Sequence, residues 1–335
     1  MQAPVGRKFF MRFLAIFFNL LEPLFRLGQR LLGPQRVAWL FVAPNLLVFG
    51  VFCFLPIAIN LIYATTGGVN LMPWQRPYTG TENFQILFEC GSYLDLSTCR
   101  KDVFWRAIFN TLKFSLLQVG LMVLFSLITA LVLNRKILGR GFWRGVFFYP
   151  VLLSPVVVAL IWKWLLQSQG AFNAGLLAAG MEPVGWLTEG GWAFFWVVFV
   201  SIWAHMGFYT LILLAGLQAI PRDLYEAAEM DRATPWRTLT RITLPLLMPN
   251  LVVVLVLAAI RAVQVFDEVF VLTGGGPGSA TTFIVQFIYQ TGFAEQIHLY
   301  GLAAAASLAL AVFLIFLTLA QLRLTRASEL GQKGR

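Results

Sequence analysis

The sequence predicts an all-α polytopic membrane protein with six transmembrane helices, an N-terminal helix in the membrane interface and a helical cytoplasmic loop before the fifth span. Of its 335 residues, 59% are hydrophobic and only 12% are charged, about half the charged share of a soluble domain. Six apolar segments are long enough to cross a bilayer. The basic residues, which give a net charge of +10, gather in alternate loops. This composition excludes a soluble enzyme, a disordered protein and a nucleic-acid-binding protein, because a soluble domain could not bury so much apolar surface.

The N-terminal tail, residues 1–36, is expected to be cytoplasmic and to hold an amphipathic helix at residues 9–32. Charged residues recur there between phenylalanines and leucines, a pattern typical of a helix lying in the membrane interface. Arg7 and Lys8 precede this stretch as in a signal peptide. Arg12 interrupts it and no small-residue cleavage site follows, so we expect no cleaved signal.

A membrane domain is expected over residues 37–322, followed by a cytoplasmic tail at 323–335. About 20 apolar residues are needed to cross the hydrocarbon core. The segments that meet this length are 37–64, 107–133, 145–166, 192–217, 246–272 and 301–322. Prolines occur within three of these spans, at Pro44, Pro56, Pro150, Pro155 and Pro249. We expect them to kink the helices without breaking them.

The distribution of basic residues predicts that both termini are cytoplasmic. Most of the 25 lysines and arginines fall before the first span, between the second and third, between the fourth and fifth, and after the sixth. The opposite side has basic residues in one loop alone, at Arg76, Arg100, Lys101 and Arg106. Cytoplasmic loops carry such an excess, so the positive charge is interpreted as a topology signal.

Cysteine and histidine are too scarce to suggest metal or nucleophilic chemistry. The first external loop, about 65–106, holds Cys90 and Cys99, which either form a disulfide, if that side is oxidising, or remain free thiols. Of the two histidines, His205 lies among apolar residues and is interpreted as packed. No metal cluster and no set of acid, base and nucleophile is recognisable, so intrinsic catalysis is not expected.

The cytoplasmic loop at residues 218–250 has the composition of two short helices separated by a turn. Pro221 suits the first turn of one helix, and Thr234 with Pro235 suits the N-cap and first position of a second. Glu226, Glu229 and Asp231 stand among arginines. Such a mixed-charge element is suited to docking on another protein, although an ordinary solvated loop would have a similar composition.

This loop resembles the EAA loop of ABC-importer permeases, whose pattern is E-A-A, two residues, D-G-A, and later I-x-L-P. The matching positions are Glu226, Ala227, Ala228, Asp231, Ala233, Ile242, Leu244 and Pro245. The glycine of the pattern is Arg232 here. Since that glycine would serve the turn between the helices, its replacement puts the local backbone in question. An arginine there could also contact the partner directly.

Further segments resemble the carbohydrate-importing branch of this family, the maltose and glycerol-phosphate type. They include NTLKFSLLQV at the second span and the stretch from Tyr149 to Asn173. The run LTGGGP, Leu272 to Pro277, is similar to the first of two non-identical permeases. The glycines after Leu272 are not a nucleotide loop, because no Gly-Lys-Ser/Thr follows. They are expected to form a tight external loop.

The resemblance implies a transport subunit in a bacterial or archaeal inner membrane, not an enzyme. Its partners would be a second permease, two copies of an ABC ATPase and a solute-binding protein outside the cell. ATP and Mg would bind the ATPase, and this chain would hold no cofactor. Glu226 would anchor the loop in a cleft of the ATPase. The solute would be a disaccharide, oligosaccharide, glycosylglycerol or glycerol phosphate.

Charged groups inside spans are costly and usually face the interior of the bundle. Arg261 lies near the middle of the fifth span, and Gln264 and Glu268 follow at i+3 and i+7, so a continuous helix would place them on one face. They would either line the pathway or lock the helices through an Arg261–Glu268 bridge. Asp267 would lie on an adjacent face, nearer the external end.

Two other classes of function compete with the ABC importer. An ion-gradient-driven secondary transporter would need a proton or sodium site in the bundle, for which Arg261, Asp267 and Glu268 are the candidates, and no inverted repeat is evident. A membrane-embedded enzyme would need a catalytic cluster, and none is recognisable.

Overall fold

The computed structural model describes residues 33–93 and 95–333, and within these ranges the chain is helical. Extended pairing there is limited to two isolated bridges, Thr66 with Tyr78 and Cys90 with Cys99. The all-α prediction is confirmed. The predicted interfacial helix at 9–32 lies outside the described residues. The elements are α2 (Pro34–Phe49), η1 (Gly50–Phe54), α3 (Leu55–Ala64), η2 (Pro73–Gln75), α4 (Glu82–Phe88), η3 (Leu96–Thr98), α5 (Asp102–Asn134), α6 (Arg140–Phe148), η4 (Tyr149–Leu152), α7 (Pro155–Leu166), α8 (Ala171–Ala178), α9 (Gly190–Ala219), α10 (Arg222–Met230), α11 (Pro235–Thr238), η5 (Leu239–Thr243), α12 (Leu244–Val263), α13 (Asp267–Leu272), α14 (Ile284–Tyr289), η6 (Gln290–Ala294) and α15 (Tyr300–Lys333).

The chain divides into two units, residues 1–62 and 63–335. In the first unit, α2 runs through the π-helical segment η1 into α3, and this helix supplies the first candidate span, Val42–Ala64. Pro44 lies inside α2 and Pro56 inside α3 without breaking the helix. Both prolines are therefore tolerated, as membrane helices allow.

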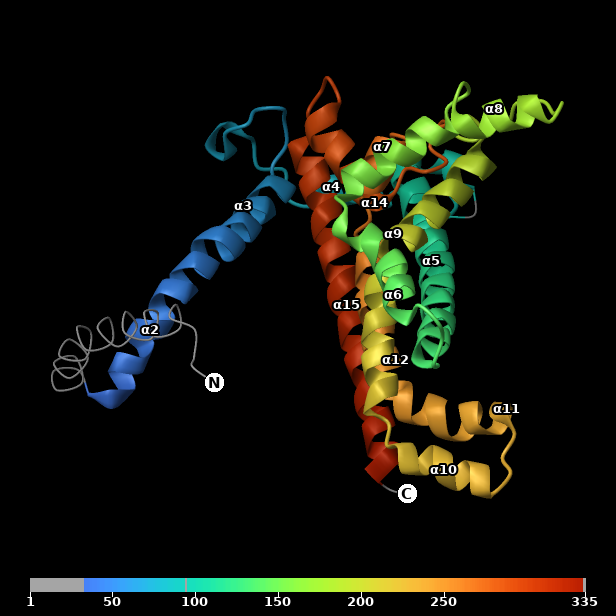
Figure 1. Ribbon diagram of the computed structural model, residues 1–335. Helices are drawn as coiled ribbons and strands as arrows, with labels where there is room; N and C mark the ends of the chain where they lie inside the picture. Colours follow the sequence, from blue (N-terminus) through green and yellow to red (C-terminus); the bar gives the residue numbers. More distant parts are fainter. Residues whose placement is uncertain (1–32, 94, 334–335) are drawn as a thin grey trace, which may run out of the picture. The chain divides into compact units, whose positions relative to one another are not determined.

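The second unit is a bundle whose central element is α9 (Figure 1). α9 packs most extensively along α5, and α12 packs against both helices. Their shared core includes Phe114 and Met122 of α5, Leu213 of α9 and Val254 of α12. The sequence of α9 is apolar on every side, and a helix of that kind is stable only when it is surrounded by other elements.

Glycines bring α9 close to its neighbours. A Cβ atom added at Gly207 would lie 2.3 Å from the carbonyl oxygen of Phe147, and one added at Gly216 would lie 2.6 Å from the side chain of Asn250. Neither position has room for a larger residue. Small residues at helix contacts let backbones approach in a membrane, where packing replaces the hydrophobic effect as the force between helices.

The third span is broken, which corrects the expectation of one kinked helix over 145–166. Helical segments at Arg140–Leu152 and Pro155–Ala178 meet at 99°. Ser154, between them, is extended with φ −61° and ψ 137°. The cause is Pro155, because a proline disfavours the helical conformation of the residue before it. Within the described residues, five helices are long and apolar enough to cross a membrane, or six if this bent pair is one span.

The fifth span is also interrupted, so the single helix predicted over 246–272 is wrong. Pro249 lies inside α12 without a break, yet α12 ends at Val263. Phe266 leaves the helical region with φ −149° and ψ −63°, and α13 begins at Asp267. Irregular backbone at membrane depth is tolerated where it is buried in protein or lines a cavity. The helix face expected to hold Arg261, Gln264 and Glu268 is therefore interrupted before Glu268.

Candidate coupling loop and membrane pathway

The loop after α9 folds into two short helices, α10 and α11, at one end of the bundle (Figure 1). α10 begins directly after Pro221, and α11 begins with Pro235 in its first position. The hydroxyl of Thr234 accepts a hydrogen bond from the backbone N–H of Arg237 at 3.4 Å. These are the starts predicted from the sequence, and Thr234 is the predicted N-cap.

Arg232 occupies the position where the EAA pattern has glycine, and it adopts the left-handed conformation with φ 52°. Two backbone hydrogen bonds close the turn around it. The N–H of Arg232 donates to the Glu229 carbonyl at 3.0 Å, and the N–H of Ala233 donates to the Ala228 carbonyl at 2.9 Å. These bonds satisfy carbonyls at the end of α10, as glycine-terminated helices do. The substitution thus leaves the glycine-type turn in place.

One face of this loop is anchored and another is exposed. Ala228 is buried, and the Tyr225 hydroxyl bonds to the Thr243 hydroxyl at 3.2 Å, which ties α10 to η5. Glu226 and Ala227 are exposed. The remaining residues of the predicted coupling set range from half-buried to exposed: Asp231, Arg232, Ala233, Leu244 and Pro245.

Two large apolar side chains of the same loop are also exposed. Met230 is 85% exposed and Trp236 is 72% exposed. A loop that exposes both large apolar and charged side chains is typical of a protein-binding surface. The loop therefore has the anchoring and the surface that a docking element needs.

Four residues predicted to line a pathway surround one cavity at the interruption between α12 and α13. Arg261, Gln264, Asp267 and Glu268 line a space of about 210 Å³. The break in the helix brings them together, in place of the continuous helical face that the spacing suggested. Arg261, Gln264 and Asp267 are exposed, whereas Glu268 is only 4% exposed.

Arg261 bonds to His205 of α9. The Nδ1 of His205 lies 2.8 Å from the Ser201 carbonyl, which can only accept, and its Nε2 faces the Nη2 of Arg261, which can only donate. His205 is therefore neutral, with its proton on Nδ1. The sequence interpretation of His205 as merely packed missed this contact. Two features of the sequence could have indicated the contact. A histidine lies inside the fourth span, four residues after Ser201, and an arginine lies inside the fifth span.

Glu268 belongs to a buried polar chain across three helices, which also passes through Ser201. The Ser201 hydroxyl donates to Glu268 Oε1 at 3.3 Å, and the Gln118 amide donates to the Ser201 oxygen at 3.4 Å. Among the residues that the structure describes, Arg261 and Glu268 form no ion pair. The bridging alternative is therefore incorrect. Sequence patterns did not indicate Gln118, which lies 83 residues from Ser201.

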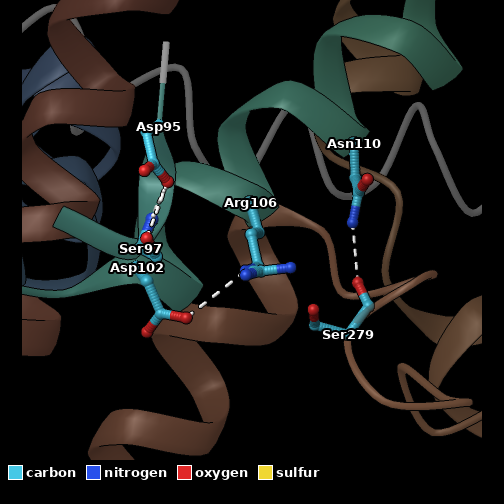
Figure 2. Close-up of polar contacts among 6 residues, drawn as sticks. All are labelled: Asp95, Ser97, Asp102, Arg106, Asn110 and Ser279. Carbon is cyan, nitrogen blue, oxygen red and sulfur yellow. Dashed lines mark hydrogen bonds and ion pairs between the residues drawn. The ribbon is translucent and has the colours of Figure 1, made fainter. Parts of the chain in front are cut away.

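The glycine-rich stretch after α13 is a tightly bonded loop. Gly274, Gly275 and Gly278 have positive φ values of 64°, 94° and 59°, which glycine adopts without steric cost. The Thr282 hydroxyl donates to the Gly275 carbonyl at 3.1 Å. Asn110 of α5 donates to the Ser279 carbonyl at 2.7 Å, as Figure 2 shows. The loop is therefore fixed both internally and to α5.

The loop between α3 and α5 contains the two cysteines of the first external loop, and Cys90 and Cys99 are joined by a disulfide.

Two charged residues of the same loop have shifted pKa values. Asp95 accepts hydrogen bonds from the Ser97 hydroxyl at 2.6 Å and the Ser97 N–H at 3.1 Å (Figure 2), and these bonds lower the pKa of Asp95. Burial lowers the pKa of Arg76, which donates to Thr66 Oγ1 at 3.0 Å and lies over the ring of Tyr63. In the described ranges no group of three or more His, Cys, Asp or Glu residues could hold a metal.

Comparison with known proteins identifies the relatives of this chain. Residues 122–329 match the family described as "Binding-protein-dependent transport system inner membrane component". The trehalose/maltose transport system permease protein MalF of Thermococcus litoralis is 37% identical over 292 residues, which cover 87% of this chain and 94% of that protein. The lactose transport system permease protein LacF of Rhizobium radiobacter is 33% identical over 76% of this chain and 83% of its own length.

Among solved structures, a bacterial alginate ABC transporter in complex with an alginate pentasaccharide-bound periplasmic protein contains a similar chain. The TM-score is 0.73 and the sequence identity is 26%, and the match covers 89% of this chain and 97% of that one. The likeness therefore extends over nearly the whole fold.

Proposed function

Because the chain belongs to the family of binding-protein-dependent transport system inner membrane components, we propose that it forms half of the pathway by which an ABC importer takes up a sugar or oligosaccharide. It is a multi-pass permease subunit of the inner membrane, and it is a transport component without catalytic activity of its own. The observation that carries the proposal is the α10–α11 loop, which keeps the EAA pattern, an exposed Glu226 and a glycine-type turn at Arg232.

The solute class is supported by the named substrates of the relatives. Trehalose and maltose, lactose, and sulfoquinovosyl glycerol are all sugars or sugar derivatives in the names of proteins 31% to 37% identical to this chain. The cavity supports the same class. Arg261 and Gln264 donate hydrogen bonds, and Asp267 and Glu268 accept them. Sugar hydroxyls need both kinds of partner. Glycosylglycerol and glycerol phosphate also fit such a mixture.

The assembly we propose contains this chain, a second non-identical permease, two copies of an ABC ATPase and an external solute-binding protein. ATP and Mg bind the ATPase. The run from Leu272 to Pro277 supports assignment to the first-permease type. The excess of basic residues in alternate loops supports cytoplasmic termini, with the membrane domain at 37–322 between tails at 1–36 and 323–335.

The coupling mechanism follows from how the loop is anchored. α10 follows α9 directly, and α11 continues through η5 into α12. The Tyr225–Thr243 hydrogen bond and buried Ala228 hold these elements together, so a displacement of Glu226 by the ATPase moves the ends of both helices. α12 leads in turn to the cavity at Arg261. ATP drives transport in this way only if the ATPase binds the inward and outward states with different affinities.

A charge reversal at Glu226 tests the proposal. The chain is co-expressed with its partner subunits and purified, and the ATPase that remains bound is quantified. Glu226→Lys should lose most of the bound ATPase, because it reverses the charge of the acid that we propose to anchor the loop. Glu182→Lys is the matched control, since it reverses an exposed acid on the predicted external side. Equal retention of the ATPase by both variants would overturn the proposed role of Glu226. Uptake that needs an ion gradient and no ATPase would favour the secondary transporter.

A further inference from the structure

Two arginines of α6 converge on a single amide at the end of α9. Arg140 and Arg144 are four residues apart and therefore lie on one face of α6. With the Gln218 amide oxygen facing them, Arg140 Nη2 donates to it at 3.1 Å and Arg144 Nη2 donates at 2.8 Å. Two positive groups are thus held side by side against one neutral acceptor.

The charge of this pair is not neutralised. Neither arginine forms an ion pair with any acid in the part of the chain that the structure describes. The Nε atoms of both are buried without a hydrogen-bond partner. A guanidinium group has five N–H donors in a planar fork that suits phosphate and carboxylate oxygens. Two such forks that share one acceptor have spare donors for an anion.

The remaining surface of α6 is apolar and exposed. Phe142 is 70% exposed, Trp143 is 46% exposed, and Val146 is also exposed. A short helix with aromatic residues on one side and arginines on another is typical of the membrane interface, where the rings enter the acyl boundary and the cations face the headgroups. α6 follows the second span on the side that we propose to be cytoplasmic.

We propose that Arg140, Arg144 and Gln218 bind the phosphate of an anionic phospholipid of the cytoplasmic leaflet. Basic pockets between transmembrane helices on this side are suited to anionic headgroups. The apolar face of α6 would meet the acyl chains of the same lipid. The inference rests on the sidedness in the proposed function. Gln218 lies in the last turn of α9, four residues before Arg222 begins α10. The lipid therefore braces the bundle next to the coupling loop.

Lipid binding is measured on the complete transporter in nanodiscs of phosphatidylcholine mixed with phosphatidylglycerol. Native mass spectrometry counts the phosphatidylglycerol molecules retained by wild type, by Arg140→Gln/Arg144→Gln, and by Arg135→Gln/Lys136→Gln. The last variant removes the same charge from exposed residues of the preceding linker. One retained lipid should be lost from the first double variant alone. Each basic residue near a membrane surface contributes about fivefold to the general attraction of anionic lipid, so both double variants should lose this attraction equally, by roughly 30-fold, and a difference between them reports the site.

Several outcomes would overturn the proposal. Equal lipid retention by both double variants would place the lipid elsewhere. Loss of the ATPase from Arg140→Gln/Arg144→Gln, with lipid retention unchanged, would show that the pair docks an acidic protein surface. Inorganic phosphate and phosphatidylglycerol are each added to the complex in phosphatidylcholine. Equal thermal stabilisation by the two would show a general anion site. The proposed importer fails separately: a wild-type chain that binds no co-expressed ATPase and still retains the lipid would contradict the importer and support the lipid site.

Discussion

Replacing Arg232 by glycine should stabilise the turn between α10 and α11. Arg232 has a φ of 52°, and an L-residue in the left-handed region loses about 1–2 kcal/mol to contact between its Cβ and the backbone. Glycine avoids that contact but loses more chain entropy on folding, by about 0.5–1 kcal/mol. The difference leaves roughly 0.5–1 kcal/mol in favour of Arg232→Gly, a two- to fivefold shift of the local opening equilibrium.

Hydrogen–deuterium exchange of the loop in the purified complex measures this shift. The reporting amides are those of Arg232 and Ala233, which donate to the carbonyls of Glu229 and Ala228 and exchange when the turn opens. The amide of Ala233 should exchange two to five times more slowly in Arg232→Gly, by the estimate above.

Two further variants separate backbone strain from loss of charge. Arg232→Val should exchange faster than wild type, because a β-branched residue is a marked outlier at positive φ. Arg237→Ala, which removes an exposed arginine from the same loop at a helical position, should leave the turn unchanged. Exchange in Arg232→Gly that equals or exceeds the wild-type rate would show that the left-handed conformation of Arg232 costs the turn nothing.

Three other substitutions test the packing and the pathway. Gly207→Ala should destabilise the purified complex by about 1–3 kcal/mol through overpacking against Phe147, and thermal unfolding should show it less stable than Gly120→Ala, whose added methyl meets open space. His205→Leu removes the acceptor of Arg261 and should lower transport about tenfold at unchanged assembly, since hydrogen bonds to charged groups contribute about 1.5–3 kcal/mol. His205→Gln, which restores an acceptor, should recover part of the activity, and equal loss in both variants would argue against the contact. Gln264→Leu should impair uptake while the complex still assembles, and normal uptake would remove Gln264 from the pathway.

Long apolar segments made most of the fold predictable. α5, α9 and α15 follow from length and hydropathy alone, because a helix is the simplest way to satisfy the backbone inside a membrane. The two interruptions were not predictable in this way. Pro155 breaks the third span whereas Pro249 does not break the fifth. The difference depends on whether neighbouring groups can satisfy the freed carbonyls.

The coupling loop was more accessible to prediction than the cavity. Thr234, Pro235 and the turn at Arg232 act through neighbouring residues, so local sequence contains their signal. The His205–Arg261 contact joins residues 56 positions apart, and its existence depends on how α9 and α12 pack. The four residues line one cavity, and their role in a pathway stays a prediction; the shared helix face from which it was made is interrupted, because the helix ends between Arg261 and Glu268.

Uptake into proteoliposomes shows whether this chain belongs to an ATP-driven importer. The complex of this chain with its second permease and ATPase is reconstituted, and entry of a labelled disaccharide such as trehalose or maltose is followed with the solute-binding protein on the outside. Uptake should require ATP and Mg inside, the ATPase and the binding protein, and it should persist when ion gradients are abolished. Uptake by the permease pair that continues without any ATPase and collapses with the ion gradient would contradict the assignment of this chain to an ATP-driven importer.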